Sequence, residues 1–203
     1  MDDLRVCLVG DSFVAGVGDP DHLGWVGRVA ARSHGAGRPL TAYALGVRRQ
    51  TSQDAADRWR AECTPRLPDG CDGRVVVAAG VNDTTLDAGA TGPRLATADS
   101  ARHLARMLSE VRDAGWASLV VGPPPIADPE QNERIARLDM AFSATCRADG
   151  VGYVRVFEDL SADAVWMQQV AADDGAHPAA EGYRRLADLI WVQWLPWITT
   201  DIP

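Results

Sequence analysis

The chain has 203 residues, of which 46% are hydrophobic and 24% are charged, and its formal net charge at pH 7 is −8. This composition is that of a globular protein, and the length suits a single domain, residues 1–203, with a core of its own. The acidic balance argues against a nucleic-acid partner and against an anionic membrane surface, because both require clustered lysine and arginine.

The sequence does not predict membrane insertion or export. Its first apolar run is too short for a signal peptide, and the residues before it are polar and acidic. The other candidate, residues 189–198, is interrupted by Gln193 and Pro196 and cannot span a bilayer. We therefore expect a cytoplasmic protein without stable membrane insertion.

The four cysteines lie outside the pair spacings that are typical of metal sites. Cys7 and Cys146 fall on apolar faces, where a small buried side chain is the usual interpretation. Cys63 and Cys71 flank a proline-rich loop that a disulfide could bridge, although cytosolic thiols usually stay reduced. Both states of this pair remain open at the level of the sequence.

Short apolar runs alternate along the chain with stretches in which apolar side chains recur at helical spacing. The first four runs end at glycine or proline, and the five runs predict buried strands over residues 5–9, 39–45, 73–79, 116–122 and 152–157. Helices are predicted over residues 24–34, 51–63, 93–114 and 129–148, and a last helix begins at Pro178. Residues 158–177 are expected to be irregular. The last helix is expected to bury Tyr183, Leu186, Ile190 and Trp194.

This alternation predicts an α/β fold, a doubly wound and mostly parallel five-stranded sheet with helices on both faces. In a parallel sheet the carboxyl ends of all strands lie on one rim, where such folds bind ligands. Ser12 follows the first predicted strand, Gly46 the second and Asn82 the third. Asp174 and His177 precede the last helix, so all five residues can converge at this rim.

The residue types at these positions are those that acyl transfer requires. The reaction needs a hydroxyl nucleophile, an imidazole that takes and returns its proton, and a group that orients the imidazole. We assign Ser12 as the nucleophile and His177 as the general base and then the general acid. Asp174, three residues earlier in one turn, would fix the tautomer of the imidazole, and the neighbouring Asp173 is the alternative.

An oxyanion hole needs fixed donors aimed at the point where the carbonyl oxygen becomes negative. The backbone N–H groups of Ser12 and Gly46 and the side-chain amide of Asn82 are the candidates. Glycine at position 46 would let the backbone approach the substrate without a Cβ in the way. Taken alone, Asn82 would be a turn residue, and Asp174 with His177 a capping turn. Their occurrence in this order at one expected rim is what favours catalysis.

These motifs resemble those of a known family over essentially the whole length of the chain. The four blocks that resemble the SGNH (GDSL-type) esterase and lipase family are Gly10-Asp11-Ser12, Gly46, Gly80-Val81-Asn82-Asp83 and Asp174-Gly175-Ala176-His177-Pro178. The resemblance implies a flavodoxin-like three-layer sandwich, a serine hydrolase mechanism without metal or cofactor, and ester or thioester substrates. It also implies that Asp11 and Asp83 support the two loops that carry them.

The second block departs from the family pattern, which often has an asparagine before the glycine and a second glycine after it. Ala44 and an arginine pair that begins at Arg48 occupy these places. Arg48 would either sit at the pocket mouth and attract an anionic substrate or be an ordinary solvated side chain. Trp166 and Met167 would either form an apolar wall for the acyl group or pack in the core. Residues 123–125, all proline, would form a stiff wall at the same rim.

We expect an esterase that acts on a small-molecule ester with a small or medium acyl group. A carbohydrate O-deacetylase or an acyl thioesterase is the alternative, with the same residues and a different pocket. A non-catalytic binding module on this fold would have no physical reason to retain Ser12, Asn82 and His177. A nucleotide- or flavin-binding protein would need a phosphate loop after the first strand, where Asp11 would repel phosphate.

Overall fold

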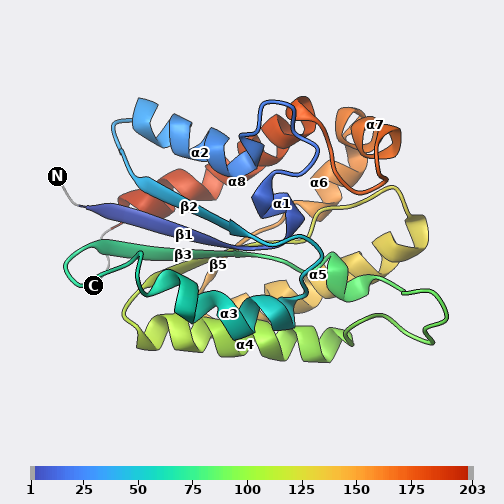
Figure 1. Cartoon of the computed structure of the whole chain (residues 1–203), viewed down its shortest axis with the longest axis horizontal. Coiled ribbons are helices and arrows are strands. Elements are labelled where there is room, and N and C mark those ends of the chain that lie inside the picture. Colours follow the sequence, from blue (N-terminus) through green and yellow to red (C-terminus); the bar gives the residue numbers. More distant parts are fainter. Residues whose placement is uncertain (1–2, 201–203) are drawn as a thin grey trace.

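The computed structural model describes residues 3–200, which form a parallel sheet between two layers of helices (Figure 1). The strands are β1 (Leu4–Gly10), β2 (Thr41–Gly46), β3 (Asp72–Ala78), β4 (Ala117–Val121) and β5 (Gly152–Val154). Their order in the sheet is β2-β1-β3-β4-β5, and every neighbouring pair is parallel. The predicted α/β fold with a five-stranded parallel sheet is therefore confirmed.

Helices cover both faces of this sheet. The helical elements are α1 (Ser12–Ala15), α2 (Gly24–Gly35), α3 (Ser52–Cys63), the 3₁₀ turn η1 (Asn82–Thr84), α4 (Thr97–Asp113), α5 (Pro129–Asp149), α6 (Phe157–Ala162), α7 (Ala164–Ala172) and α8 (Ala180–Thr199). α2 and α8 lie on one face, and α3, α4 and most of α5 lie on the other (Figure 1). Within residues 3–200, no helix combines the length and apolar character needed to cross a membrane.

β1 is an interior strand of the sheet, between β2 and β3, and its side chains alternate between the two helical layers. Val6 and Leu8 pack with α2 and α8, whereas Cys7 and Val9 pack with α3, α4 and α5. All four side chains are fully buried. A strand that is covered on both faces reads as a continuous apolar run, which is why residues 5–9 could be recognised in the sequence. The predicted buried face of α8 is likewise confirmed.

The prediction that residues 158–177 are irregular is wrong for most of the segment. α6 and α7 occupy it as far as Ala172, and β5 ends at Val154 rather than at residue 157. Asp163 begins α7, because its carboxylate accepts hydrogen bonds from the N–H groups of Val165 and Trp166. The helix is too short to show a clear periodicity in the sequence, and tertiary packing of its buried side chains stabilises it.

The four cysteines all lie within the described residues, and all are free. The expected alternative of a Cys63–Cys71 disulfide is thus not formed. Cys63 is buried at the end of α3, where its side chain contacts the thiol of Cys7 on β1. Cys71 is partly exposed on the loop that leads into β3.

The end of β2 packs closely on the backbone of α1. A Cβ atom at Gly46 would collide with the backbone nitrogen of Ala15 and would lie 2.5 Å from the carbonyl oxygen of Asp11. Glycine was expected here so that the backbone could approach a substrate. The structure adds a sufficient reason of its own, because only glycine lets β2 and α1 lie side by side.

We therefore expect Gly46→Ala to lower the free energy of unfolding by about 3 kcal/mol, the upper end of ordinary overpacking. The clash is with backbone atoms, which cannot move aside as a flexible side chain would. Urea denaturation followed by circular dichroism measures the change. Gly35→Ala is the matched control, since no atom lies within 4 Å of a Cβ at that position. Equal stability of the two variants would contradict the packing argument.

Candidate active site

The chain turns sharply at the end of β1, and this turn presents Ser12. Asp11 caps α1, because its Oδ1 accepts a hydrogen bond of 3.0 Å from the N–H of Phe13. Gly16 then ends the helix in the left-handed conformation, with φ 73°. Ser12 therefore lies at the carboxyl end of β1, the first strand, as the sequence predicted.

Three predicted residues form a continuous chain of short contacts. Oγ of Ser12 is 2.7 Å from Nε2 of His177, and Nδ1 of the same ring is 2.7 Å from Oδ2 of Asp174. The other oxygen of Asp174 accepts hydrogen bonds of 2.9 Å from the N–H groups of Ala176 and His177. One carboxylate thus shapes the turn and holds the ring. Asp173 ends α7 with an exposed side chain.

The surroundings set the charge of this carboxylate. Burial alone would raise the pKa of Asp174, but the hydrogen bonds from His177 and Ala176 outweigh it and lower the pKa to about 2. The group is therefore ionised at neutral pH and accepts a hydrogen bond from the N–H at Nδ1 of His177. This leaves the lone pair of Nε2 directed at the hydroxyl of Ser12.

Neighbouring elements hold the loop that carries His177. The N–H of Ala127, after β4, donates a hydrogen bond of 2.8 Å to the carbonyl oxygen of Gly175. Oε1 of Gln169, on α7, accepts hydrogen bonds from the N–H groups of Ala179 and Gly182 at the start of α8. The loop is thereby fixed on both sides, which restricts where the imidazole can point.

Asn82 begins η1 in the loop after β3, and hydrogen bonds fix its side chain. Its Nδ2 donates to the carbonyl oxygen of Gln50 at 3.0 Å and lies 3.4 Å from Oδ2 of Asp11. The fully buried Asp83 accepts hydrogen bonds from the N–H of Ser52 at 2.7 Å and from its hydroxyl at 2.5 Å. The loop after β3 is therefore joined to the start of α3. These contacts agree with the supporting role that the resemblance implies for Asp11 and Asp83.

The structure does not bring all of the expected substrate-binding residues to the rim. Trp166 is fully buried, stacks behind Phe13 at 6.4 Å between ring centroids, and donates from Nε1 to the carbonyl oxygen of Pro125. Of the two alternatives for Trp166, packing in the core is the one observed. The expectation that it forms an apolar wall for the acyl group is therefore wrong. Met167 is half-buried and packs on the same core. Arg48 is exposed on the loop after β2.

Phe13 is the aromatic residue that lies against the site, and the sequence reasoning missed it. Its ring centroid is 4.9 Å from that of His177, and its side chain is 4% exposed. Position 13 directly follows the candidate nucleophile, which is the only signal in the sequence that could have indicated it.

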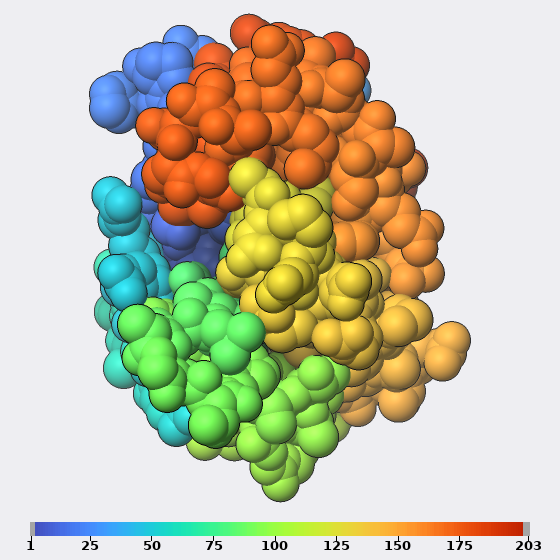
Figure 2. Space-filling view, turned by 90° about the vertical axis from the view of Figure 1, so that its right-hand side faces the viewer, coloured from blue at the N-terminus to red at the C-terminus, as the bar shows by residue number. Residues whose placement is uncertain are grey.

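The surface is hollowed at this rim, as the view from the carboxyl ends of the strands shows (Figure 2). The deep blue floor belongs to the N-terminal segment with α1, and the loops after β2 (cyan), β3 (green) and β4 (yellow) and the segment before α8 (orange-red) surround it. Ser12 and His177 are only 6% and 7% exposed. A cavity of about 520 Å³ lies at the opposite end of the sheet and is lined by Arg74, Trp116 and Trp197 among others, without any of the site residues.

The described residues 3–200 hold no group of three or more His, Cys, Asp or Glu side chains arranged to bind a metal ion. The groups that the structure brings together at the rim are a hydroxyl, an imidazole, a carboxylate and a side-chain amide. These are the groups that acyl transfer uses.

Comparison with known proteins agrees with this description. The family model described as the GDSL-like lipase/acylhydrolase family matches residues 8–185. The search of curated proteins finds no match.

Three solved structures illustrate the similarity of fold. The lipase/acylhydrolase from Enterococcus faecalis has 22% identity and a TM-score of 0.76, with 94% of each chain covered. The psychrotrophic esterase EstA from Pseudoalteromonas sp., inhibited by monoethylphosphonate, has 16% identity and a TM-score of 0.73, with 98% of this chain and 100% of that chain covered. The acetyl xylan esterase AlAXEase has 17% identity and a TM-score of 0.73, with 94% and 99% covered.

The buried Asp11 leads to a prediction about pH and stability. Burial raises the pKa of this carboxyl to about 7, against the opposing hydrogen bond from Phe13. The folded state then binds the proton more tightly than the unfolded state, so this group costs stability as pH rises from about 4 to about 7. Asp11→Asn keeps the capping oxygen but cannot ionise.

We compare the free energy of unfolding of Asp11→Asn with that of the wild type. The value for the variant minus the value for the wild type should rise by on the order of 3 kcal/mol between pH 4 and pH 8. Urea denaturation at several pH values measures this difference. Asp69→Asn is the control, because that carboxyl is exposed, and its curve should run parallel to that of the wild type. A parallel curve for Asp11→Asn would contradict the assigned environment.

Proposed function

The chain belongs to the GDSL-like lipase/acylhydrolase family, and from this premise we propose that it is a serine hydrolase that cleaves carboxylic esters of small or medium acyl groups. The observation that carries the proposal is the unbroken chain of contacts from Ser12 through His177 to Asp174. A serine that is merely structural would not need an imidazole at 2.7 Å whose other nitrogen is held by a carboxylate.

The reaction follows from this arrangement in two steps. Oγ of Ser12 attacks the ester carbonyl carbon as Nε2 of His177 takes its proton, and the imidazolium then protonates the departing alcohol. The acyl group is left on Ser12. Water then attacks the acyl carbon, His177 again takes a proton, and Ser12 leaves with that proton restored as the acid is released. Asp174 stabilises the imidazolium in both steps.

The tetrahedral intermediates carry a negative oxygen, and three donors would bind it. These are the backbone N–H groups of Ser12 and Gly46 and the side-chain amide of Asn82. One hydrogen of this amide is already committed to the carbonyl oxygen of Gln50 at 3.0 Å. The contact with Asp11 is long, at 3.4 Å, so the second hydrogen is the one that the oxyanion would take over.

The loops beside the hollow favour an apolar acyl group. Val47, directly after β2, and Leu86, after η1, are large apolar side chains with exposed fractions of 39% and 43%, and they would offer an acyl group apolar contacts. The same catalytic residues would also cleave a thioester or a sugar acetate, so the substrate series below includes both.

Ser12→Ala should lower kcat at least about a thousandfold, because no other group on the rim can form the acyl intermediate. The assay uses p-nitrophenyl esters from two to twelve carbons, acetylated sugars and an acyl-coenzyme A thioester. Ser161→Ala is the matched control, since that hydroxyl is exposed on α6. A fluorophosphonate should label Ser12 in the wild type, as mass spectrometry can detect. Equal activity of the wild type and Ser12→Ala, or a label on another residue, would contradict the proposal.

Asp174→Asn should lower kcat at least about a hundredfold with little effect on KM. The amide cannot stabilise the imidazolium, and it permits the wrong tautomer of His177. The neighbouring Asp173→Asn tests which acid orients the ring and should change kcat less than about threefold, because Nδ1 of His177 pairs with Asp174. A reversed order of the two losses would show that the orienting acid has been assigned wrongly.

A further inference from the structure

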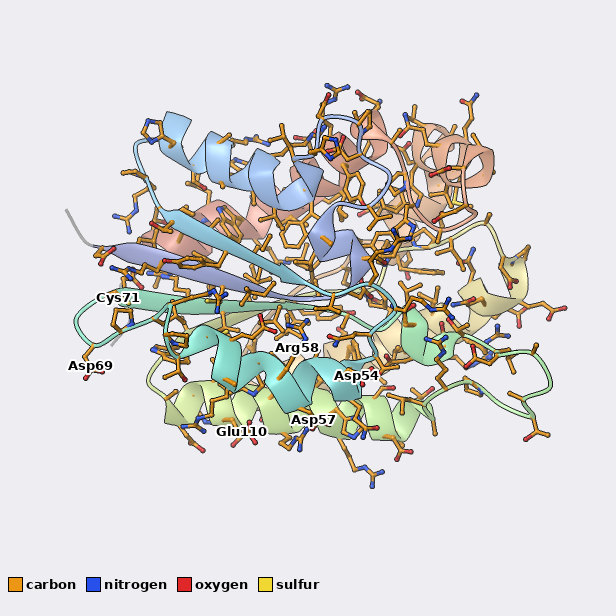
Figure 3. The ribbon with its side chains drawn as sticks, viewed as in Figure 1. Asp54, Asp57, Arg58, Asp69, Cys71 and Glu110 are labelled. Carbon is orange, nitrogen blue, oxygen red and sulfur yellow. The ribbon has the colours of Figure 1, made fainter. Side chains whose placement is uncertain are left out.

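One arginine on α3 contacts the ends of the two strands that carry the candidate site. Nη2 of Arg58 donates hydrogen bonds of 2.8 Å to the carbonyl oxygens of both Gly10, the last residue of β1, and Leu45 on β2. Figure 3 shows Arg58 on the side of α3 that faces the sheet, whereas Asp57 lies on the side toward α4. The exposed fraction of the Arg58 side chain is 17%.

The contact with Leu45 bears directly on the oxyanion hole. The carbonyl of Leu45 and the N–H of Gly46 belong to one peptide group, and no peptide bond among the described residues is cis. In a trans peptide the C=O and the N–H point in opposite directions within one plane. Arg58 therefore holds the oxygen of the peptide whose N–H is a proposed donor, and so sets the direction of that N–H.

A second path leads from the same guanidinium to Asn82. Nε of Arg58 donates a hydrogen bond of 2.5 Å to the side-chain oxygen of Gln50. The main-chain oxygen of Gln50 in turn accepts the hydrogen bond from Nδ2 of Asn82 at 3.0 Å. Glu62, one turn later on α3, pairs with Nη1 of Arg58 at 2.6 Å and so helps to hold the guanidinium in place.

We propose that Arg58 is a positioning residue for the oxyanion hole, which orients and polarises the N–H of Gly46 and holds the amide of Asn82 through Gln50. This inference rests on the proposed hydrolase function. A cation at the oxygen end of a peptide strengthens the donor at its other end, because linked hydrogen bonds polarise one another. Lysine cannot replace the planar guanidinium, since its three rotatable donors on one nitrogen cannot reach all four acceptors at once.

The test compares Arg58→Met and Arg58→Lys with Arg60→Met, an exposed arginine on the same helix. Each protein is assayed on a p-nitrophenyl ester and on the corresponding thionoester, in which sulfur replaces the carbonyl oxygen. Sulfur is a poor hydrogen-bond acceptor, so thionoester cleavage gains little from the oxyanion donors. The ratio of kcat/KM for the ester to that for the thionoester therefore reports the strength of the oxyanion hole.

For Arg58→Met we expect kcat on the ester to fall about 10- to 100-fold, less than for direct loss of a donor, with KM changed less than about threefold. The ester-to-thionoester ratio should fall about tenfold. The kcat and the ester-to-thionoester ratio of Arg58→Lys should lie between those of Arg58→Met and the wild type. Both quantities should be the same in Arg60→Met as in the wild type. Thermal unfolding of each variant separates these effects from loss of folded protein.

An equal loss on both substrates would overturn the inference, because a role in stability alone would lower both rates together. Where Arg58→Met yields too little folded enzyme, Arg58→Lys decides, and an unchanged ratio in that variant likewise overturns it. A wild type that lacks hydrolase activity and takes no fluorophosphonate at Ser12 would instead remove the proposed function.

Discussion

The hydrogen bond between Ser12 and His177 joins residues that are 165 positions apart, and it is the contact that connects the two ends of the chain at the rim. Neither residue can reach the other unless β1 ends where α8 begins. The parallel sheet meets this condition, because it brings the carboxyl end of β1 beside the loop before α8. The close packing of Gly46 on α1 then brings the end of β2 to the same place.

Three carboxyl groups near this bond have pKa values that are shifted in different directions, because their surroundings differ. Asp174 accepts hydrogen bonds from its own turn, which hold its pKa at about 2 and keep it ionised beside the imidazole. Asp11 and Asp83 are buried, and burial raises the pKa of each. Their oxygens cap α1 and the start of α3 instead. One acid is thus placed to act on His177, and the other two hold the loops around it.

A layer of contacts behind the rim restricts the reactive groups without touching a substrate. Phe13 lies against the ring of His177 and is itself backed by the buried Trp166. Gln169 fixes the start of α8 from α7. Arg58 reaches the ends of β1 and β2 from the opposite face of the sheet. The site is therefore held from both helical layers, which fixes the positions of its hydrogen-bonding groups.

The sequence by itself determined the strands, the long helices and the rim, because strand runs, capping residues and glycine stops are local patterns that act over a few residues. It also indicated Ser12, Asn82, Asp174 and His177, since each follows a strand or precedes the last helix. The short helices α6 and α7 were not recognisable, as they depend on packing more than on periodicity. The burial of Trp166, the place of Phe13, the free Cys63 beside Cys7 and the reach of Arg58 were decided only by the tertiary structure. Each depends on which distant side chains share the same space, and no local pattern records that.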